Sequence, residues 1–394
     1  MDICIYFQVH QPLRLGGFSI FSENASDGKD YFDSDLNRQI MEKVAGKCYL
    51  PTNSLMLELL EKNPEYRVSY SLTGVFLEQC RLFAPEVLES FAALAKTGRA
   101  EFLSETYYHS LSYLFSDKDE FVEQIDLHNK AISQFAKPSP VFRNTEAMFS
   151  NDIAYLVERL GYTGILAEGL EHLLGWRSPN YLYGVKGTKK IKALLRHYKL
   201  SDDIGYRFSA KWWSEYPLTA DKYARWLSQL QGDCTNIFMD YETFGEHHWS
   251  DTGIFEFLRA LPGEVGKHKH LNFATPSQLV EKIPVKDDID APDITSWADM
   301  ERDTSAWLGN DMQRNAFALY ESLGKKVKET RDKDAIRTWR MLGNSDHFYY
   351  MCTKSLSDQD VHNYFSPYDS PFDAYINYMN VISDFSEKIG NGKK

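Results

Sequence analysis

The sequence predicts an α/β fold, namely an irregular (β/α) barrel followed by a C-terminal helical domain. Strand-like runs alternate with amphipathic helical segments through the first two thirds of the chain, a pattern typical of a parallel sheet. Acidic or histidine side chains follow several of these runs, at His10, Glu105, Glu146 and Asp240. Barrel enzymes carry their chemistry at the carboxyl ends of their strands. One site shared by many strand ends therefore favours a closed barrel over an open, doubly wound sheet.

The predicted strands are short apolar or alternating runs that end at a glycine, a proline or a charged residue. They span 3–10, 66–73, 100–106, 141–145, 163–167, 191–198, 236–240 and 271–275. Between them, apolar residues at helical spacing and glycine or proline stops predict helices over 36–62, 85–97, 118–136, 150–160, 220–230 and 253–261.

The chain changes character after Lys282, where an acidic, proline-bounded link occupies residues 285–292. Beyond the link the pattern is helical, with predicted helices over 311–329, 332–342 and 371–389. We therefore expect a barrel catalytic domain over 1–285 and a C-terminal helical domain over 286–394 that contributes to the active site.

Two further segments have no predicted helix or strand. The tail 390–394 is expected to be disordered. The loop 16–33, rich in glycine, serine and aspartate, is either a lid or a surface excursion.

Charge and cysteine content narrow the partners and the compartment. The net charge is −12, so we expect neither a nucleic acid nor an anionic membrane as a partner. The five cysteines are scattered and form no C-x-x-C pair, which favours a reducing compartment and argues against a structural zinc site. No leader-like segment or long apolar span is visible, so we expect a cytoplasmic protein. The sequence indicates no oligomeric state.

Aromatic residues make up 14% of the chain. The apolar faces of sugar rings stack on aromatic side chains, while sugar hydroxyls need acidic, amide and histidine partners. A chain rich in both kinds favours a carbohydrate ligand over a small apolar one.

The segment 236–249 concentrates chemistry-bearing residues. A buried, apolar strand is predicted to run into Asp240, followed closely by Glu242, His247 and Trp249. Aromatic residues interleave with these charges, which favours a binding site over a solvated acidic loop. Burial and the neighbouring carboxylate would both raise the pKa of Asp240, which suits a general acid.

A second acid, Glu146, lies between a predicted strand and a predicted helix start. Two carboxylates at the mouths of two strands are the minimum requirement for glycosidic bond cleavage. Arg143 and Asn144 are near enough in sequence to hold Glu146 ionised, which suits a nucleophile. The alternative is a helix N-terminal acid that interacts only with the helix dipole.

Other candidate residues surround this pair in the sequence. Gln8 and His10 share one face of the first strand because side chains alternate along it. Glu78 follows the second strand and is also consistent with a helix cap. In the helical region, Trp297, Asp303 and Trp307 fit either a sugar subsite or, for Trp307 above all, a core position.

Together these segments resemble glycoside hydrolase family 57, in its α-amylase branch. The matching motifs are His-Gln-Pro at 10–12, Gly-x-x-Leu-Glu at 74–78, Arg-Asn-Thr-Glu at 143–146, Asp-x-Glu-x-Phe-Gly at 240–245 and the segment 297–307. One departure is Gln8, where some branches of the family have a histidine. This difference concerns substrate preference and not the two carboxylates.

The resemblance implies a seven-stranded (β/α) barrel followed by helices, retaining action on α-glucans, and no obligatory metal or other cofactor. Glu146 would be the nucleophile and Asp240 the acid/base in cleavage of α-1,4 bonds of starch, glycogen or maltodextrins through a glutamyl-glucosyl intermediate. The residues expected to bind substrate are Gln8, His10, Glu78, Glu242, His247, Trp249, Trp297, Asp303 and Trp307.

Three alternatives stay open at this point. The same site is a 4-α-glucanotransferase if a sugar replaces water as acceptor. A metal-dependent polysaccharide deacetylase needs an aspartate and two spaced histidines, whereas His247 and His248 are adjacent. A non-catalytic glucan-binding protein would usually have lost one of the two carboxylates.

Overall fold

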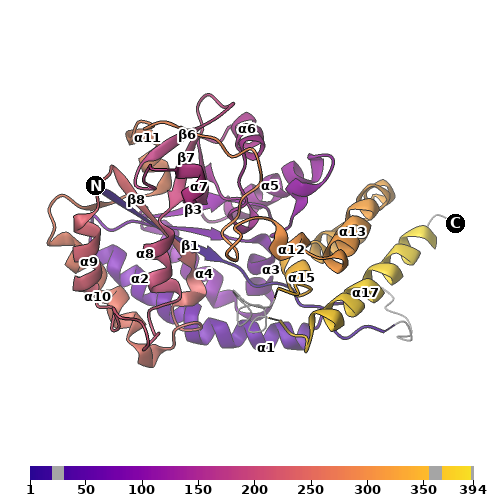
Figure 1. Cartoon of the computed structure of the whole chain (residues 1–394). Helices are drawn as coiled ribbons and strands as arrows, with labels where there is room; N and C mark the ends of the chain where they lie inside the picture. Colours follow the sequence, from indigo (N-terminus) through magenta and orange to yellow (C-terminus); the bar gives the residue numbers. More distant parts are fainter. Residues whose placement is uncertain (20–30, 355–365, 392–394) are drawn as a thin grey trace.

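The computed structural model describes residues 1–19, 31–354 and 366–391, and it contains a closed barrel of seven parallel strands (Figure 1). In spatial order they are β7 (Lys192–Arg196), β5 (Gly164–Glu168), β4 (Pro138–Phe142), β3 (Ala100–Ser104), β2 (Val68–Leu72), β1 (Asp2–Val9) and β8 (Cys234–Asp240). The predicted barrel is therefore confirmed.

The barrel closes through a short contact between β7 and β8. Arg196 pairs with Asn236 there, and the side-chain amide of Asn236 donates to the backbone carbonyl of Leu195 at 2.9 Å. The Arg196 Nε also donates to the carbonyl of Phe238 at 2.8 Å. Side chains thus complete a closure in which the described backbone pairs at only one position, which is why the barrel is irregular.

Three further strands extend the sheet outside the barrel. They are β6 (Leu182–Val185), antiparallel to β7; β9 (Asn272–Phe273), beside β1; and β10 (Asp288–Ile289), beside β6. The strands β6 and β10 were not predicted from the sequence, and β9 is shorter than the strand predicted over 271–275. A short strand leaves too little periodicity to be recognised.

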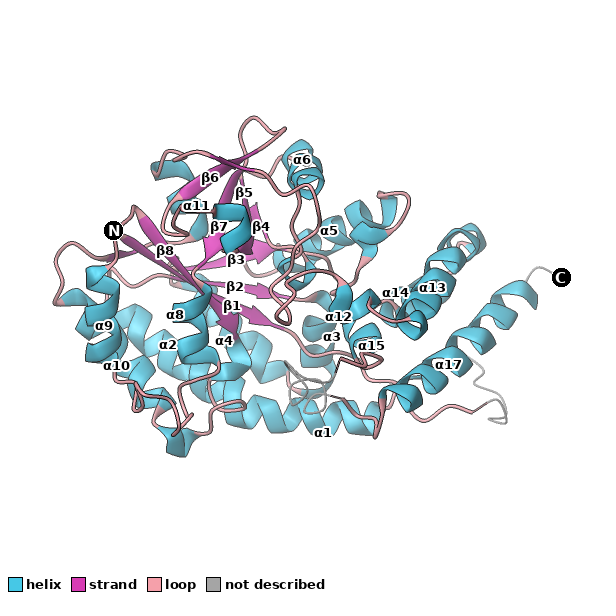
Figure 2. Cartoon of the chain, viewed as in Figure 1, coloured by secondary structure: helices cyan, strands magenta, loops and turns pink. Residues whose placement is uncertain are grey.

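Helices cover the outside of the barrel (Figure 2). They are α1 (Ser34–Val44), α2 (Leu50–Lys62), α3 (Gly74–Phe83), α4 (Pro85–Lys96), α5 (Asp119–Ile132), α6 (Asn151–Arg159), α7 (Glu171–Leu174), α8 (Tyr198–Gly205), α9 (Ala220–Gln229), α10 (Ile254–Gly266) and α11 (Pro276–Lys282). The C-terminal helices are α12 (Ser305–Leu308), α13 (Asp311–Thr330), α14 (Lys333–Leu342), α15 (Ser345–Tyr349) and α17 (Pro371–Asn391).

Two helices differ from the prediction in instructive ways. The helix predicted over 36–62 is divided into α1 and α2 by a π-helical turn, Ala45–Tyr49. The helix predicted to stop at residue 261 instead continues through Pro262 to Gly266. A buried apolar face on α10 outweighs the local cost of the proline.

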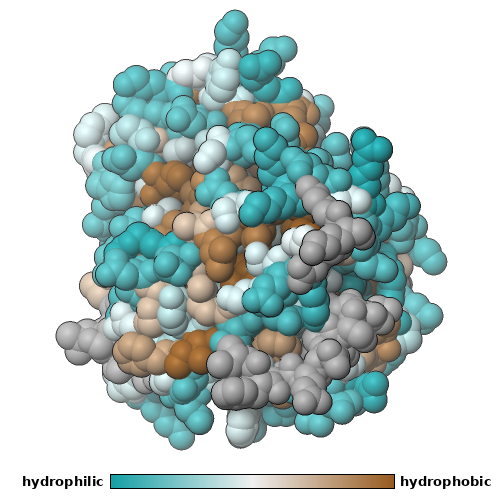
Figure 3. Space-filling model, turned by 90° about the vertical axis from the view of Figure 1, so that its right-hand side faces the viewer, coloured by the Kyte–Doolittle hydropathy of each residue, from teal (hydrophilic) through white to brown (hydrophobic). Residues whose placement is uncertain are grey.

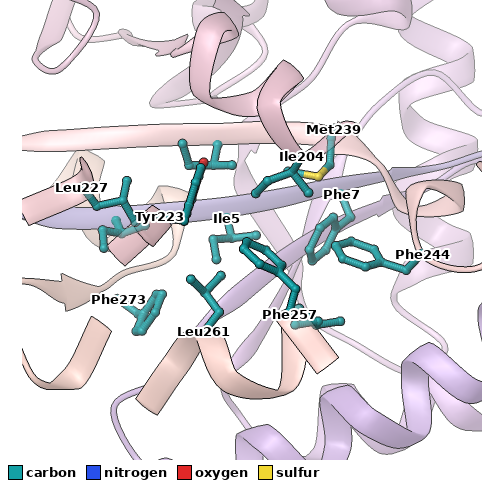
Figure 4. A pocket seen from close by; sticks show the side chains of 13 residues that line it. Ile5, Phe7, Ile204, Tyr223, Leu227, Met239, Phe244, Phe257, Leu261 and Phe273 are labelled. Atoms are coloured by element: carbon teal, nitrogen blue, oxygen red, sulfur yellow. The ribbon is translucent and has the colours of Figure 1, made fainter. Parts of the chain in front are cut away.

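The barrel interior has an apolar layer built by alternate residues of its strands. Side chains that pack together there include Tyr6, Leu103, Val141, Leu166, Leu194 and Phe238. The intervening residues point outward to the helices. A cavity of about 10 Å³, room for about one water molecule, lies in that outer core between the strands β1 and β8 and the helices α8, α9 and α10. Figure 4 shows side chains that line it, among them Phe7, Tyr223 and Phe257.

The C-terminal helices share one hydrophobic core with one side of the barrel. This core joins Phe142 of β4 and Leu195 of β7 to Trp307, Tyr320 and Trp339 of the helical region. The domain boundary at 285/286 stays a prediction.

The loop 16–33 and the C-terminal tail are described only in part. Asn377 of α17 binds both Phe18 N and Gly16 O, so the start of the loop packs against this helix. Residues 20–30 lie outside the described residues, and the lid question with them. Of the tail predicted to be disordered, residues 392–394 also lie outside, whereas α17 extends to Asn391.

Among the helices that the structure describes, none combines the length and apolarity needed to cross a bilayer. The five cysteines are free and buried.

Candidate active site

A polar layer lies directly above the apolar layer of the barrel, toward the carboxyl ends of the strands. It follows from strand periodicity, because the residue two positions after each inward apolar side chain points the same way. Each strand, or the residue directly after it, contributes one member: Gln8, Ser71, Glu105, Arg143, Glu168, Arg196 and Asp240. In strand register Gln8 is paired with both Ser71 and Asp240, and Glu168 is paired with Arg196. Both catalytic candidates lie at this end, since Glu146 follows β4 and Asp240 ends β8.

The carboxylate of Glu146 is held by three donors from distant parts of the chain. His109 Nε2 lies 3.1 Å from Oε1, and the Ser345 hydroxyl donates to the same oxygen at 3.2 Å. Trp297 Nε1 donates to Oε2 at 2.9 Å. The side chain is 18% exposed, so one face stays open to solvent. Trp297, predicted as a stacking residue, is thus a hydrogen-bond donor to this carboxylate.

The backbone at Glu146 is left-handed, with φ of 56°, and Ala147 follows with φ of 51°. Such conformations are costly for residues other than glycine and cluster at functional sites. Asn144 stabilises this turn, because its side chain accepts from Thr145 N and donates to Met148 O. It does not contact the carboxylate, contrary to the expectation from its sequence position.

Electrostatics around Glu146 favour its ionised form. Burial alone would raise the pKa of Glu146, but the hydrogen bond and charge of His109 and the charge of Arg143 outweigh it. The pKa of Glu146 is therefore lowered. Arg143 is 1% exposed and lies 4.8 Å from the centre of the Trp297 ring. None of its guanidinium nitrogens has a hydrogen-bond partner among the described residues, so its positive charge is not neutralised by a direct ion pair.

Asp240 has the opposite environment. Asp240 precedes a short 3₁₀ turn, and its side chain forms no capping hydrogen bond there. Burial and the negative charge of Glu146 raise the pKa of Asp240 to about 6. The like charge that matters most is thus Glu146, and not Glu242 as expected from the sequence. The two carboxylates are electrostatically coupled although they are 94 positions apart by residue number (240 − 146).

The loop after Asp240 is fixed by the segment between α1 and α2. Gly245 has φ of 107°, and a Cβ there would lie 2.0 Å from Lys47 O, so only glycine fits. The Tyr49 hydroxyl donates to Glu242. Burial and the charge of Asp240 raise the pKa of Glu242 to about 8, which makes it a neutral acid near pH 7.

The first strand brings two predicted residues to the same region. Gln8 is 2% exposed and accepts hydrogen bonds from the hydroxyls of Tyr6 and Ser71. His10 lies 2.8 Å from Thr73 Oγ1 and 3.1 Å from Asp346 Oδ2. Burial lowers the pKa of His10, and the charge of His109 lowers it further.

The loop after β8 carries His247 and Trp249, both predicted to bind substrate, with His248 between them. His248 contacts Ser209 Oγ and the carbonyl of Ile204, so it anchors this loop to its neighbour. Burial and its neighbour His248 lower the pKa of His247 to about 4. Trp249 is 58% exposed, with Lys47 Nζ 4.9 Å from its ring centre.

Three predicted substrate-binding residues have structural partners instead. Glu78 accepts from the Tyr107 hydroxyl and pairs with Arg337, which ties α3 to α14. Asp303 accepts from Ser305 N at 2.8 Å, directly before α12. Trp307 is 1% exposed within the shared core. Packing of α12 against the other helices favours the core position that the sequence left open, and a sugar contact of Trp307 stays a prediction.

Several residues of the site were missed as candidates in the sequence. His109, Ser345 and Asp346 contact Glu146 or His10 but follow no predicted strand directly. Glu105 was noted only as a strand end. A weak signal exists for Asp346, since Asn344-Ser-Asp reads as a helix start, and Asn344 does cap α15.

Among the described residues, His10, His109 and Asp346 form a group whose ligand atoms lie within 4.8 Å of one another. A histidine that binds zinc must be neutral, and its unprotonated ring nitrogen must face the metal. His109 Nε2 faces Glu146 instead, and the two imidazole rings are stacked, with centroids 4.1 Å apart. This arrangement favours hydrogen bonding over metal ligation.

The strands point toward the face on the right of Figure 1, where the C-terminal helices lie. Turned toward the viewer in Figure 3, this face has hydrophobic side chains near its centre and hydrophilic surface around them. A barrel with two coupled carboxylates at its strand ends fits the class of glycoside hydrolases.

Comparison with known proteins identifies the family. The model of "Glycosyl hydrolase family 57" matches residues 4–292. A protein of Methanocaldococcus jannaschii named "Putative alpha-amylase" is 48% identical over 400 residues, which cover 99% of this chain and 85% of that protein. The chain belongs to glycosyl hydrolase family 57 and is a glycoside hydrolase, as the sequence motifs predicted.

More distant relatives agree with this assignment. An alpha-amylase of Pyrococcus abyssi is 20% identical over 79% of this chain, which spans 45% of that protein. The crystal structure of a branching enzyme of the same family from Thermococcus kodakaraensis has a TM-score of 0.69 at 12% identity, covering 99% of this chain and 90% of that one. A 4-alpha-glucanotransferase from Thermococcus litoralis has a TM-score of 0.60 at 17% identity, covering 89% of this chain and 51% of that one. These two structures establish the shared fold.

Proposed function

We propose that the protein is a retaining glycosidase that cleaves α-1,4 bonds of starch- or glycogen-type α-glucans and maltodextrins. Glu146 is the nucleophile and Asp240 is the general acid/base. The observation that carries the proposal is the placement of both carboxylates at the carboxyl ends of barrel strands, in surroundings that shift their pKa values in opposite directions. A low pKa keeps Glu146 ionised for attack, and a pKa of about 6 lets Asp240 hold a proton in mildly acidic to neutral solution.

In the first step the Glu146 carboxylate attacks the anomeric carbon while Asp240 protonates the leaving glycosidic oxygen. The C–O bond to the leaving sugar breaks, and a glucosyl ester of Glu146 forms. Loss of the negative charge on Glu146 removes the main like charge that faces Asp240, while Asp240 itself has become a carboxylate. Asp240 then takes a proton from water, which opens the ester and releases the sugar with its original anomeric configuration.

The α-glucan substrate is supported by the names of the two alpha-amylase relatives and by the chemistry of the site. The polar layer provides amide, carboxyl and imidazole groups for sugar hydroxyls, and Trp297 and Trp249 provide aromatic rings. Gln8 on β1 and His10 directly after it, with Glu242 and His247 after β8, are the proposed sugar-binding residues. The free, buried cysteines support a cytoplasmic location and therefore an internal storage glucan as substrate.

The test is incubation of the purified protein with maltoheptaose, with products separated by size, beside Glu146→Gln. Shorter products only, absent in the variant, are the expected result. Longer products as well would assign the same intermediate to transfer onto a sugar, as in a 4-α-glucanotransferase. No change of maltoheptaose in either sample would contradict the α-1,4-glucan assignment.

A further inference from the structure

His109 is a buried histidine placed between two carboxylates, in a loop that follows β3. Its Nε2 lies 3.1 Å from Glu146 Oε1 and its Nδ1 lies 3.6 Å from Glu105 Oε2. The His109 side chain is 4% exposed and that of Glu105 is fully buried. Among the described residues, the Glu105 oxygens form no hydrogen bond, and His109 is their one ion-pair partner. The two carboxylates therefore share one imidazole.

The loop around His109 is fixed independently of its side chain. Its backbone is left-handed, with φ of 50°, and its carbonyl accepts from Ser345 N at 2.9 Å. The next residue, Ser110, donates to Gln124 Oε1 at 2.8 Å and forms a backbone bridge with Asn344. A costly conformation held from several sides is typical of a residue whose placement matters for function.

His10 is stacked on His109 but has a different charge. Its two nitrogens contact Thr73 and Asp346, and its pKa is lowered by burial and by the charge of His109. For His109, burial alone would lower the pKa, but Glu105 and Glu146 outweigh this and raise it to about 9. The stack therefore pairs a neutral ring with a charged one, and the charged ring contacts Glu146.

The other charged groups that face this pair come from several elements. Arg143 of the polar layer opposes protonation of His109, and Asp346 of α15 raises the pKa of Glu146. His128 of α5 contacts Glu105 N and lowers the pKa of Glu105. His109 is the cation among them that contacts the Glu146 carboxylate directly.

We propose that His109 is a positioning residue that orients Glu146 and keeps it ionised before attack. Glu105 holds His109 as an imidazolium. The inference rests on the proposed function, since it assigns His109 a role in that reaction. When the ester forms, the charge on Glu146 disappears and the imidazolium is left facing Glu105. When water opens the ester, the released carboxylate regains its ion pair with His109, so the same contact assists the second step. The proton stays on His109 throughout.

The kinetic test compares His109→Gln with Ser345→Ala, because both side chains contact the same oxygen of Glu146 and only one is charged. In wild type, kcat/KM falls in acid as Glu146 becomes protonated. His109→Gln is expected to lower kcat about 100-fold with little change in KM. It should also raise the pKa of the acidic limb of the kcat/KM profile by about one unit or more. Ser345→Ala should lower kcat by about tenfold and leave that limb nearly in place. An acidic limb that does not move in a folded His109→Gln protein would overturn the proposal.

A spectroscopic test is independent of turnover. With ¹⁵N-labelled histidine, the resonance missing from the spectrum of His109→Gln identifies His109, and its titration gives its charge. We expect His109 to stay protonated through pH 7 in wild type and its pKa to fall in Glu105→Gln. A neutral His109 at pH 7 would contradict the inference even if the enzyme is active. If maltoheptaose is not cleaved, the proposed function fails, whereas this titration still tests the ion pair.

Discussion

Glu146 and Asp240 lie at the same end of one barrel, yet the groups around them shift their pKa values in opposite directions. Glu146 receives three hydrogen bonds and lies beside a protonated histidine and a buried arginine. Asp240 ends an apolar strand, and burial and the negative charge of Glu146 raise its pKa. The same functional group is therefore an anion in one place and an acid in the other.

The difference shows where the charge asymmetry of the site arises. Strand ends bring both carboxylates to the mouth of the barrel, but the donors to Glu146 come from the loop after β3 and from the C-terminal region. The loop of Asp240 is supported by the segment between α1 and α2, which contacts Glu242 and the backbone but not Asp240 itself. The C-terminal helical region thus supplies donors to Glu146, and its Asp346 also contacts His10, whereas these contacts do not include Asp240.

Removal of the Glu146 carboxylate should have the largest effect. Glu146→Gln keeps the shape and most hydrogen bonds but has no anion to form the ester, so we expect kcat to fall by about 10⁴-fold or more. Initial rates with maltoheptaose measure this, and the melting temperature serves as the control for folding. A residual rate within tenfold of wild type would remove Glu146 from the nucleophile role.

Asp240→Asn should have a smaller effect that depends on the leaving group. With a glucan, loss of proton donation is expected to lower kcat by about 10²- to 10⁴-fold. With α-maltosyl fluoride the first step needs no proton, because fluoride leaves as an anion, so the loss in that step should be much smaller. Pre-steady-state fluoride release measures it. Equal losses on both substrates would mean that the two carboxylates do not have distinct roles.

Trp297→Phe tests whether the environment of Glu146 depends on the helical region. The variant keeps an aromatic ring near Arg143 and Arg196 but removes the indole donor to Oε2. A hydrogen bond to a charged group contributes about 1.5–3 kcal/mol, so kcat should fall by roughly 10- to 100-fold. In its pH profile, the pKa of the acidic limb, which reports Glu146, should be raised, while the pKa of the basic limb, which reports Asp240, stays unchanged. A change in KM alone would instead indicate a sugar-stacking role.

The pH dependence of wild type gives the most gradual effect. Cleavage needs Asp240 protonated and Glu146 ionised, so kcat/KM should peak in mildly acidic solution. Above the pKa of about 6 for Asp240, the rate should fall about tenfold per pH unit, since the protonated fraction falls by that factor. Rates with a short maltooligosaccharide between pH 4 and 9 measure it. A rate that is flat through pH 8 would contradict the assignment of Asp240 as the acid.

Much of the fold could be predicted from local sequence patterns. The seven barrel strands and most of the surrounding helices leave a periodicity of two or near four residues, and turn residues mark their ends. The short strands β6 and β10 were not predicted because they leave too little periodicity, and the π-helical turn between α1 and α2 lies within a segment whose apolar spacing predicted one continuous helix. Trp307 illustrates the same limit, since a tryptophan in a polar segment fits both a sugar subsite and a core.

For the site, the sequence by itself placed Glu146 and Asp240 at strand ends, and closure of a parallel barrel then brings such residues to one mouth. Tertiary structure decided which of them is ionised. The donors to Glu146 are 37, 151 and 199 positions away in the chain, a separation at which no local pattern links donor and acceptor. The pKa of a carboxyl group depends on burial and on the charges within a few ångströms, and those neighbours are set by folding.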